Sequence, residues 1–498
     1  MCHHNNVMMC RKIYYEQSLK LMPNRLIQKV TGLFRSKPTS SPVKEPIHIQ
    51  NTEAQTDQDN TARIIPEQTH QIPRKHLDDN AAKVVYRLLD AGYEGYLVGG
   101  CIRDILIKKR PKDFDIATNA HPEEAHELFQ RSRLIGRRFK LLHVRFGREI
   151  IEVATFRAGH DSEENDDDVK GKQAESGLIL RDNVYGTIEE DALRRDFTIN
   201  ALYYCVKDHS IYDFTNGYED IQKKVIRLIG NPDNRYKEDP VRMLRAIRFA
   251  AKLDFEIEQA TAAPIRQQAH LLQDIAPARL FDETLKLFQS GHAATAYQLL
   301  KEYQLLEQLL PSATKAIKKQ SDDGLAEALI LQGLKNTDRR INQRKSVTPA
   351  FLFATLLWHP LQTRMQEILK QNSKMPQLVA LHAAANDIIA QQVKRTAIPR
   401  RFSTPIREIW ELQLRLPKRF GNRAEQLLEH PRFRAAYDLL LLREQSGESL
   451  NNLGQWWTQY QSASTQEKEQ MVSELASDGQ PSRKPRRRRR AKNDPRNA

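Results

Sequence analysis

The stretch YLVGGCIRDILIKKRPKDFDIAT, residues 96–118, decides how this chain is expected to fold. An apolar run stops at a Gly-Gly pair, a short amphipathic segment and a basic loop follow, and the stretch closes on Asp113-Phe114-Asp115. Because side chains alternate across a β-strand, Asp113 and Asp115 are expected on one face, while Phe114 points into the core. The pattern predicts a strand, a glycine turn, a helix and a second strand that begins with two carboxylates.

Carboxylates on one face of a strand, here those of Asp113 and Asp115, supply the hard oxygen ligands that Mg²⁺ prefers. Two such ions about 4 Å apart suit in-line phosphoryl transfer. The glycine pair, Gly99 and Gly100, lets backbone N–H groups approach a phosphate chain. An Asp-x-Asp alone is a weak signal, because most occur in turns or at solvated strand ends. Gly-Gly, Arg-Asp and Asp-x-Asp in this order are far more specific.

This combination resembles the catalytic head of the bacterial nucleotidyltransferase family that includes tRNA CCA-adding enzymes and poly(A) polymerases. The resemblance covers about residues 75–460, and the runs LFDETLKLFQSGHA, TPAFLFATLLWHP and LEHPRFRAAYDLLLLR favour the poly(A) polymerase branch. It implies an α+β fold, in which an N-terminal nucleotidyltransferase head with a mixed β-sheet and helices precedes all-α neck, body and tail domains. The expected parts are a disordered extension at 1–72, the head at 73–230, the neck at 231–300, the body at 301–460 and a disordered basic tail at 461–498.

The composition favours a polyanionic partner. The chain has 78 Lys and Arg against 63 Asp and Glu, a net charge of +15, which suits nucleic acid or a membrane surface. No window approaches the roughly 18 apolar residues of a membrane span, and the N-terminus lacks the apolar core of a secretory signal. The four cysteines form no CxxC pair, so a cytoplasmic location is expected. Residues 481–498 hold nine Lys or Arg and one acid, and this tail is expected to neutralise RNA phosphates.

A third carboxylate is expected from a β-hairpin. Two strand-like runs, 140–146 and 149–156, are joined by a Gly-Arg pair. The second run contains Glu152 among apolar residues, where a carboxylate is costly unless it meets a metal or a cation. One interpretation places Glu152 on the solvent side of an edge strand. The favoured interpretation makes it a third metal ligand beside Asp113 and Asp115.

The run EEDALRRDFTINAL, residues 189–202, carries a second group of candidates. Arg194 and Arg195 suit a triphosphate, because guanidinium groups match phosphate oxygens. Asp196 is either the N-cap of a helix running to Tyr204 or a carboxylate of the active centre, which orients the ribose or supports the metal site. The family resemblance favours the second interpretation. It assigns the triphosphate and ribose to Gly99, Gly100, Arg103, Arg194 and Arg195.

The segment 235–249, RYKEDPVRMLRAIRF, is expected to open the neck with a helix that begins at Pro240. From the residues alone, it is a helix capped by Asp239, with a solvated basic face that includes Arg242 and Arg245. The resemblance implies a different role for the same segment, because EDPVR matches the EDxxR motif with which the family reads the incoming nucleotide.

On that reading, Asp239 and Arg242 meet the base, Glu238 supports them, and Arg245 belongs to the nucleotide site. A carboxylate accepts a hydrogen bond from the adenine N6 amino group, and a guanidinium donates to N1. Such a site rejects a mismatched base strongly, because buried polar groups would be left unpaired. Cytosine presents the same donor and acceptor pair, so the motif does not separate an enzyme that adds only A from one that adds C and A.

The resemblance therefore implies a template-independent polynucleotide adenylyltransferase that adds AMP from ATP to RNA 3′ ends. Two Mg²⁺ ions held by Asp113, Asp115 and Glu152 would assist it, with Asp196 completing the centre. The expected partners are RNA 3′ ends, ATP and RNA-degradation machinery, and the expected state is a monomer. Two alternatives stay open: a tRNA CCA-adding enzyme, and an RNA-binding protein with an inactive head. The intact Asp113 and Asp115 pair argues against the second.

Overall fold

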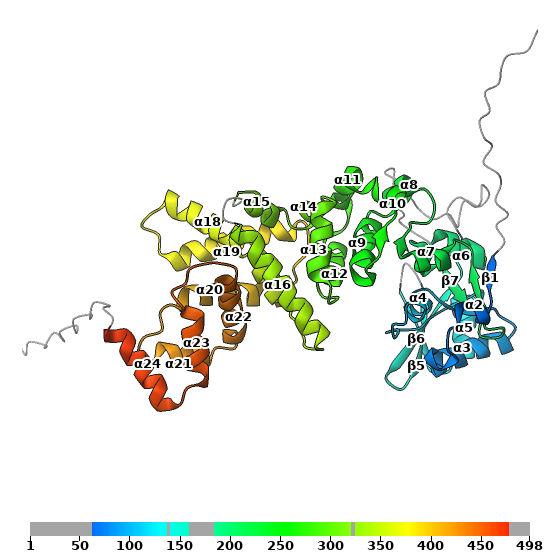
Figure 1. Ribbon diagram of the computed structural model, residues 1–498, viewed down its shortest axis with the longest axis horizontal. Helices are drawn as coiled ribbons and strands as arrows, with labels where there is room; N and C mark the ends of the chain where they lie inside the picture. Colours follow the sequence, from blue (N-terminus) through cyan, green and yellow to red (C-terminus); the bar gives the residue numbers. More distant parts are fainter. Residues whose placement is uncertain (1–61, 137–139, 159–183, 320–323, 478–498) are drawn as a thin grey trace, which may run out of the picture. The chain divides into compact units, whose positions relative to one another are not determined.

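The computed structural model describes residues 62–136, 140–158, 184–319 and 324–477 of the chain (Figure 1). A mixed β-sheet with its helices comes first, and the rest of the described chain is almost entirely helical. The predicted α+β order, a sheet-bearing head followed by helices, is confirmed. Among the helices of these ranges, none combines the length and the apolar character of a membrane span.

The head is built on an eight-stranded sheet with the order β1-β8-β7-β2-β3-β6-β5-β4. The strands are β1 (Arg63–Ile65), β2 (Gly95–Val98), β3 (Asp115–Thr118), β4 (Ser132–Ile135), β5 (Leu141–Phe146), β6 (Glu149–Thr155), β7 (Leu202–Tyr204) and β8 (Ile211–Asp213). Strands β3 and β6 run parallel, whereas β2 and β3 are antiparallel. The end of β2, the start of β3 and the middle of β6 therefore lie next to one another in the sheet.

Helices cover both faces of this sheet. The helices of the head are α2 (Glu67–His70), α3 (Asp79–Asp90), α4 (Gly100–Leu106), α5 (Pro122–Leu128), α6 (Ile188–Arg194) and α7 (Gly217–Lys223). Helix α3 begins where the Asp78 carboxylate accepts hydrogen bonds from two backbone N–H groups, and its apolar side packs on the face that carries Leu97 and Ile116. Helix α6 covers part of the opposite face through Ala192, which packs with Val98 and neighbouring aromatic rings.

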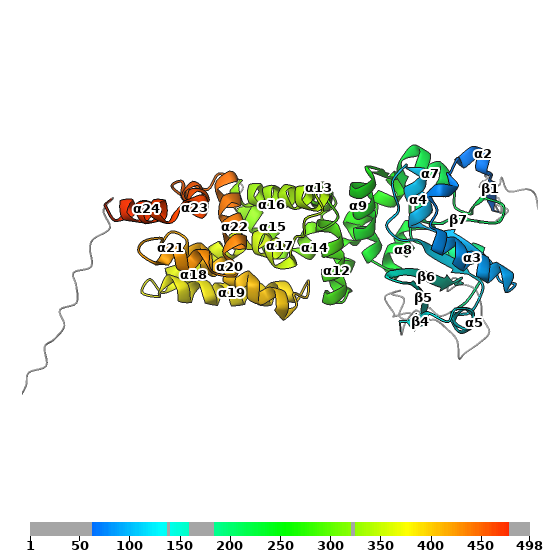
Figure 2. The ribbon, with the colours of Figure 1, turned by 90° about the horizontal axis from the view of Figure 1, so that it is seen from below.

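The helical part follows a small parallel pair, β9 (Val225–Ile226) and β10 (Glu256–Ile257). Its helices are α8 (Pro232–Glu238), α9 (Val241–Leu253), α10 (Gln259–Ala262), α11 (Ile265–Gln268), α12 (Pro277–Phe288), α13 (Ala293–Glu302), α14 (Leu306–Leu309), α15 (Pro311–Lys319), α16 (Leu325–Asn342), α17 (Pro349–Leu356), α18 (Trp358–Gln371), α19 (Gln377–Val393), α20 (Arg400–Arg415), α21 (Arg423–Leu428), α22 (Phe433–Gln445), α23 (Leu453–Ser462) and α24 (Thr465–Ser477). Helices α18 and α19 lie side by side (Figures 1 and 2). A separate apolar cluster around Trp457 joins α20 to α23.

Two segments that were expected to be disordered contain regular secondary structure. Within the extension expected at 1–72, β1 pairs antiparallel with β8, and α2 follows it. Within the tail expected at 461–498, α24 runs to Ser477. Neither segment has the apolar periodicity on which the prediction relied, and both are held by contacts with other parts of the chain. Residues 1–61 and 478–498 lie outside the described ranges, and the boundaries at 230 and 300 stay predictions.

One local interpretation is wrong for a tertiary reason. After Asp196 the chain does not continue as a helix to Tyr204, but forms a short 3₁₀ turn at Thr198–Asn200 and then strand β7. The three residues of β7 are fully buried between β2 and β8. Pairing inside the sheet therefore overrides the helical pattern of this segment.

Candidate active site

The register of the sheet brings two of the predicted carboxylates together. Asp115, the first residue of β3, pairs with Glu152 of β6, and Glu152 pairs in turn with His143 of β5. Paired residues point to the same face, so the three side chains form a row across neighbouring strands. The His143 Nε2 atom lies 3.4 Å from Glu152 Oε1. Because β6 lies between β3 and β5, it is not the expected edge strand, but the Glu152 side chain does face solvent, with 50% of it exposed.

The ionisation of Asp115 reflects this crowding. Solvent reaches its side chain, but the protein around it removes part of its hydration, and this loss together with the Glu152 carboxylate raises the pKa of Asp115 to about 6. The carboxylate of Asp113 acts in the same direction and Arg195 opposes it. Negative charge is thus concentrated on this face, as a cation site requires.

Asp113 lies just before β3, with an exposed carboxylate 3.4 Å from Lys112 Nζ. Asp113 and Asp115 therefore do not alternate along one regular strand, as the sequence pattern had suggested. Within the part of the chain that the structure describes, no three His, Cys, Asp or Glu side chains are grouped closely enough to hold a metal ion. The donor chemistry of the three carboxylates fits Mg²⁺, and the effect of the other two on Asp115 shows that their charges interact.

The predicted glycine turn joins β2 to α4. Gly99 has a φ of +77°, and its N–H donates to the Leu202 carbonyl at 3.2 Å. A Cβ atom at this position would lie 3.4 Å from the Asn200 carbonyl oxygen and 3.5 Å from Arg195 Nη1. Glycine is required here by the positive φ. Gly100 is the first residue of α4.

Arg103 is buried within the head. Its guanidinium donates to the Asp104 carboxylate through two nitrogens, at 2.9 and 2.6 Å, and to Asn200 Oδ1 at 2.5 Å. It also lies over the Phe249 ring of α9. The structure therefore places Arg103 behind the glycine turn, where it fixes the orientation of Asn200.

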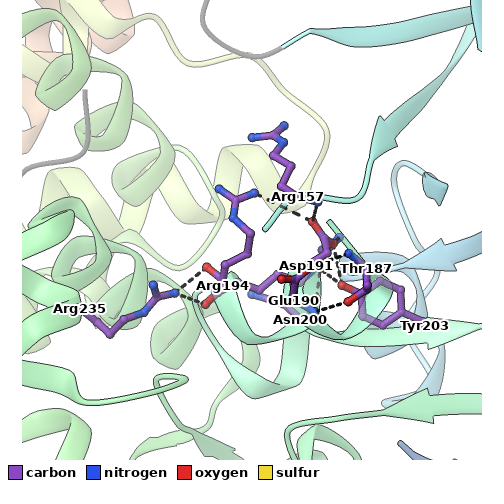
Figure 3. Close-up of polar contacts among 9 residues, drawn as sticks. Arg157, Thr187, Glu190, Asp191, Arg194, Asn200, Tyr203 and Arg235 are labelled. Carbon is purple, nitrogen blue, oxygen red and sulfur yellow. Dashed lines mark hydrogen bonds and ion pairs between the residues drawn. The ribbon is translucent and has the colours of Figure 1, made fainter. Parts of the chain in front are cut away.

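A buried carboxylate, that of Asp191, organises the end of helix α6 (Figure 3). Its Oδ2 atom accepts hydrogen bonds from Arg195 Nε and Nη2, at 3.1 and 2.9 Å, and from the Tyr203 hydroxyl at 2.7 Å. Its Oδ1 atom accepts from the Arg157 backbone N–H and lies 4.0 Å from Arg194 Nη1. Although burial opposes the charge of Arg195, Tyr203 and Asp191 raise the pKa of its guanidinium. Arg195 is thus fixed in place as a permanent cation.

Arg194 has the opposite electrostatic environment. Burial, followed by the neighbouring Arg157 and Arg195 guanidinium groups, lowers the pKa of Arg194 to about 9. Arg235 and Arg242 add to the same effect. Five arginines therefore gather around two carboxylates, those of Asp191 and Glu238, which compensate their charge in part. This excess of positive charge suits a polyanion such as a triphosphate.

Helix α8 holds the backbone that carries these arginines. Arg235 Nη2 donates to the carbonyl oxygens of Arg194 and Arg195, at 2.5 and 2.6 Å (Figure 3). Its Nη1 atom donates to Glu238 Oε2 at 2.8 Å. One guanidinium thus links the end of α6 to the beginning of the helical part.

Asp196 forms a second link to the helical part. Its Oδ1 atom accepts from the Phe197 N–H and from Asn200 Nδ2, and its Oδ2 atom accepts from Arg245 Nε of α9 at 2.6 Å. Burial opposes ionisation, but Arg245 and the hydrogen-bond donors prevail and lower the pKa of Asp196 to about 2. The Asp196 side chain is therefore held by Arg245 and Asn200, on the side of the glycine turn that faces the helical part.

The predicted base-reading residues lie at the start of α9. Arg242 is buried, and its Nη1 atom donates to Glu238 Oε2 and to the Arg235 carbonyl. Asp239 Oδ1 accepts from the Val241 N–H at 3.2 Å, and its Oδ2 atom accepts from Arg279 Nη2 of α12 at 2.7 Å. The expectation of a solvated basic face on α9 is wrong, because Arg242 is buried and Arg245 binds the head.

Three residues of this region were not foreseen from the sequence. Asp191 precedes Arg194 and Arg195 by three and four positions, a helical spacing that could have indicated the pairing. Asn200 connects Arg103 to Asp196, and Arg279 holds Asp239. No local pattern signals the bonds of Arg103 to Asn200 or of Arg279 to Asp239, because they join segments far apart in the chain.

Comparisons with known proteins agree with this architecture. A family model described as "Poly A polymerase head domain" matches residues 95–227. Models described as "Probable RNA and SrmB-binding site of polymerase A" and "Polymerase A arginine-rich C-terminus" match residues 254–317 and 373–492.

Curated relatives cover most of the chain. The chain is 51% identical over 423 residues to poly(A) polymerase I of Salmonella typhimurium, a match that covers 84% of this chain and 90% of the relative. It is 37% identical over 237 residues to a CCA-adding enzyme of Lactobacillus helveticus, which covers 47% of this chain and 56% of that enzyme. The similarity to this CCA-adding enzyme thus extends over about half of the chain.

Solved structures agree on the fold. The crystal structure of a Bacillus stearothermophilus CCA-adding enzyme in complex with CTP superposes with a TM-score of 0.50 at 24% identity. The superposition covers 80% of this chain and 82% of that one.

Proposed function

Because this chain belongs to the bacterial poly(A) polymerase I family, we propose that it adds AMP, taken from ATP, to the 3′ ends of RNA. The chain is then a nucleotidyltransferase that releases pyrophosphate. The observation that carries this function is the pairing of Asp115 with Glu152 at the end of the sheet that also holds the Gly99 turn. Carboxylates for a cation and main-chain N–H groups for phosphates then meet at one place.

Asp113, Asp115 and Glu152 would hold Mg²⁺. When bound, the metal lowers the pKa of the RNA 3′ hydroxyl and neutralises charge on the transferred phosphate. The three carboxylates supply only oxygen ligands, and loss of hydration together with the neighbouring negative charges raises the pKa of Asp115 to about 6. A divalent cation would relieve this repulsion. His143 Nε2 lies 3.4 Å from the Glu152 carboxylate, beside the proposed metal site.

The chain's own residues bind and orient the nucleotide. Gly99, whose own N–H bonds the Leu202 carbonyl, shapes the turn that brings the main-chain N–H of Gly100, at the start of α4, to the phosphates. Arg194 and Arg195 supply the opposing charge. Hydrogen bonds to Asp191 and Tyr203 fix the position of the Arg195 guanidinium. Arg103, which is buried and bonded to Asn200, would act on the triphosphate through the turn that it positions.

We further propose that Asp239 and Arg242 select adenine, with Glu238 supporting Arg242. Asp239 keeps acceptor capacity beyond its bonds to Val241 and Arg279, and Arg242 keeps guanidinium donors beyond its bond to Glu238. Arg245 and Asp196 hold α9 against the head. The RNA 3′ end and ATP are the substrates. A monomer in the cytoplasm, working with RNA-degradation machinery, is the setting that this activity implies.

The test of the function is extension of a 5′-labelled oligo(A) with each nucleoside triphosphate separately. We expect long products with ATP, and at most weak addition with CTP, GTP or UTP. Asp115→Ala is the matched control, because it should abolish extension while the variant remains folded and bound to RNA. Incorporation of CTP followed by ATP into a tRNA lacking its CCA end, without extension of oligo(A), would identify a CCA-adding enzyme. RNA binding without any incorporation would identify an inactive head.

Base selection has its own experiment. Asp239→Ala and Arg242→Ala should raise KM for ATP and change the preference among nucleotides, because each leaves half of a complementary pair in the site. If the two residues only cap and brace α9, the same variants would lose about 1 kcal/mol of stability and keep the preference. Measurements of kcat/KM for ATP, CTP and GTP, together with thermal unfolding, separate the two roles.

A further inference from the structure

A basic cavity lies beside the loop that leads to Asp113. Its volume is about 850 Å³, within the range of pockets that hold nucleotide-sized ligands. One wall is residues 70–78, which precede helix α3, and the other is the end of α4 with residues 108–114. The carboxylate row of Asp115 and Glu152 is not part of this lining.

The charge of the lining is predominantly positive. Five cations contribute to it: Lys75, Lys108, Lys109, Arg110 and Lys112. The two carboxylates of the lining are already engaged, since Asp78 caps α3 and Glu149 accepts from Asn80 Nδ2 at 2.6 Å. Within the described ranges, Lys75, Lys108 and Arg110 form no ion pair. Such a concentration of uncompensated cations favours an anionic ligand.

The floor of the cavity is apolar. Ile72, Leu77, Leu106 and Phe114 line it, and all four also pack on the core of the head. Cations beside an apolar surface that includes the aromatic ring of Phe114 fit single-stranded nucleic acid, in which phosphates meet cations and bases stack on aromatic rings. A free polyphosphate would use the rim of cations but not the apolar floor.

We propose that this cavity binds the segment of single-stranded RNA just upstream of the 3′ end that is being extended. The loop 107–114 runs along the cavity and leads into β3, where Phe114 lines the cavity and Asp115 lies on the opposite face of the strand. An RNA chain whose 3′ end lies at Asp113 therefore has to pass around the start of β3 before its preceding phosphates meet Lys108 and Arg110. The proposal rests on the proposed function for the direction of the RNA, but not for the binding itself.

The test removes charge without touching the carboxylates. The triple variant Lys75→Gln, Lys108→Gln and Arg110→Gln removes two lysines and one arginine from the rim. The matched control Lys83→Gln, Lys207→Gln and Arg63→Gln removes the same charges from exposed positions of the head outside the cavity. Binding of fluorescent oligo(A) is measured across roughly 50 to 200 mM salt.

Removal of one phosphate-binding cation lowers the slope of log K against log salt by about 0.7 for single strands, so the slope of the rim variant should fall by up to about 2. Its Kd at about 0.15 M salt should rise by as much as about fifty-fold on the same basis. The control should resemble the wild type. The rim variant should also keep its KM for ATP and its kcat at saturating RNA.

Lysine acylation of the wild-type protein, followed by mass spectrometry, gives a second measurement that does not depend on how the variant folds. Oligo(A) should protect Lys75 and Lys108 and leave Lys83 and Lys207 reactive, whereas ATP alone should protect none of them. Equal slopes for the rim and control variants overturn the proposal, and so does protection of the rim lysines by ATP alone. Binding and protection require no catalysis, so an RNA-protected rim in a protein that adds no nucleotide would refute the proposed function and leave this inference standing.

Discussion

The ion pair between Asp196 and Arg245 should contribute measurably to stability, because it joins the head to helix α9. The pKa of Asp196 lies at about 2, below its ordinary value of 3.8. At about 1.36 kcal/mol per pH unit, this difference corresponds to about 2.4 kcal/mol of stabilisation. The Asp196 side chain is 11% exposed, so solvent screens little of this energy.

The perturbation is Asp196→Asn, which preserves the shape and removes the charge. We expect the free energy of unfolding at pH 7 to fall by about 2 to 3 kcal/mol. This is at or below the low end for a broken buried ion pair, because the Arg245 side chain is 32% exposed. The Asp196 carboxyl group ionises more readily in the folded state than in the unfolded state, because its pKa is lower in the folded state. The stabilisation is therefore complete above pH 3.8 and diminishes as the pH falls toward 2.

Urea unfolding followed by far-UV circular dichroism at pH 7, 5, 4 and 3 measures this dependence. The difference between wild type and variant should be constant from pH 7 to 5 and should shrink at pH 3. The control is Asp90→Asn, an exposed carboxylate on α3. A double-mutant cycle with Arg245→Gln should give a coupling energy of about 2 kcal/mol. A coupling near zero, or a difference that stays the same at pH 3, would refute the reasoning.

Three further outcomes follow from the site. In metal-free protein, Asp115→Asn should raise the melting temperature at pH 7, because the charged form is disfavoured in the fold; the gain should be full above pH 6 and absent below pH 3.8, and a gain that is independent of pH would contradict it. Glu152→Gln should lower kcat at least about tenfold, a barrier change of about 1.4 kcal/mol, with little change in melting temperature; unchanged kcat would return Glu152 to a structural role. Truncation after residue 480 should flatten the salt dependence of RNA binding by about 0.7 for each phosphate that the tail neutralises, while single additions at saturating RNA persist; an identical slope would show that the tail does not touch RNA.

The sequence alone was enough to predict those parts of the site that depend only on residues adjacent in the sequence. The apolar run before Gly99, the turn itself and the hairpin of β5 and β6 follow from patterns a few residues long, and all are present. The register of β3 with β6 depends on pairing between distant segments. For that reason the sequence suggested that Glu152 was near Asp115 but could not place it.

The same limit explains the arginines. Their residue type indicated phosphate binding, yet the identity of each partner depends on how α8 and α9 pack against the head. Arg245 finds Asp196, and Arg103 faces inward to Asn200. Asp196 was expected at the metal site or as a helix cap. Its actual partners could be known only once the helical part was in place.

The bond between Arg235 and two consecutive carbonyl oxygens has a consequence for exchanging parts between related enzymes. The acceptors belong to the main chain, so any pair of residues at positions 194 and 195 would present them, whatever their side chains. The donor, in contrast, is one particular side chain. A hybrid whose head comes from a relative and whose helices come from this chain would therefore inherit the connection intact. The reciprocal hybrid would keep it only if its own helix carried an arginine at the position equivalent to 235.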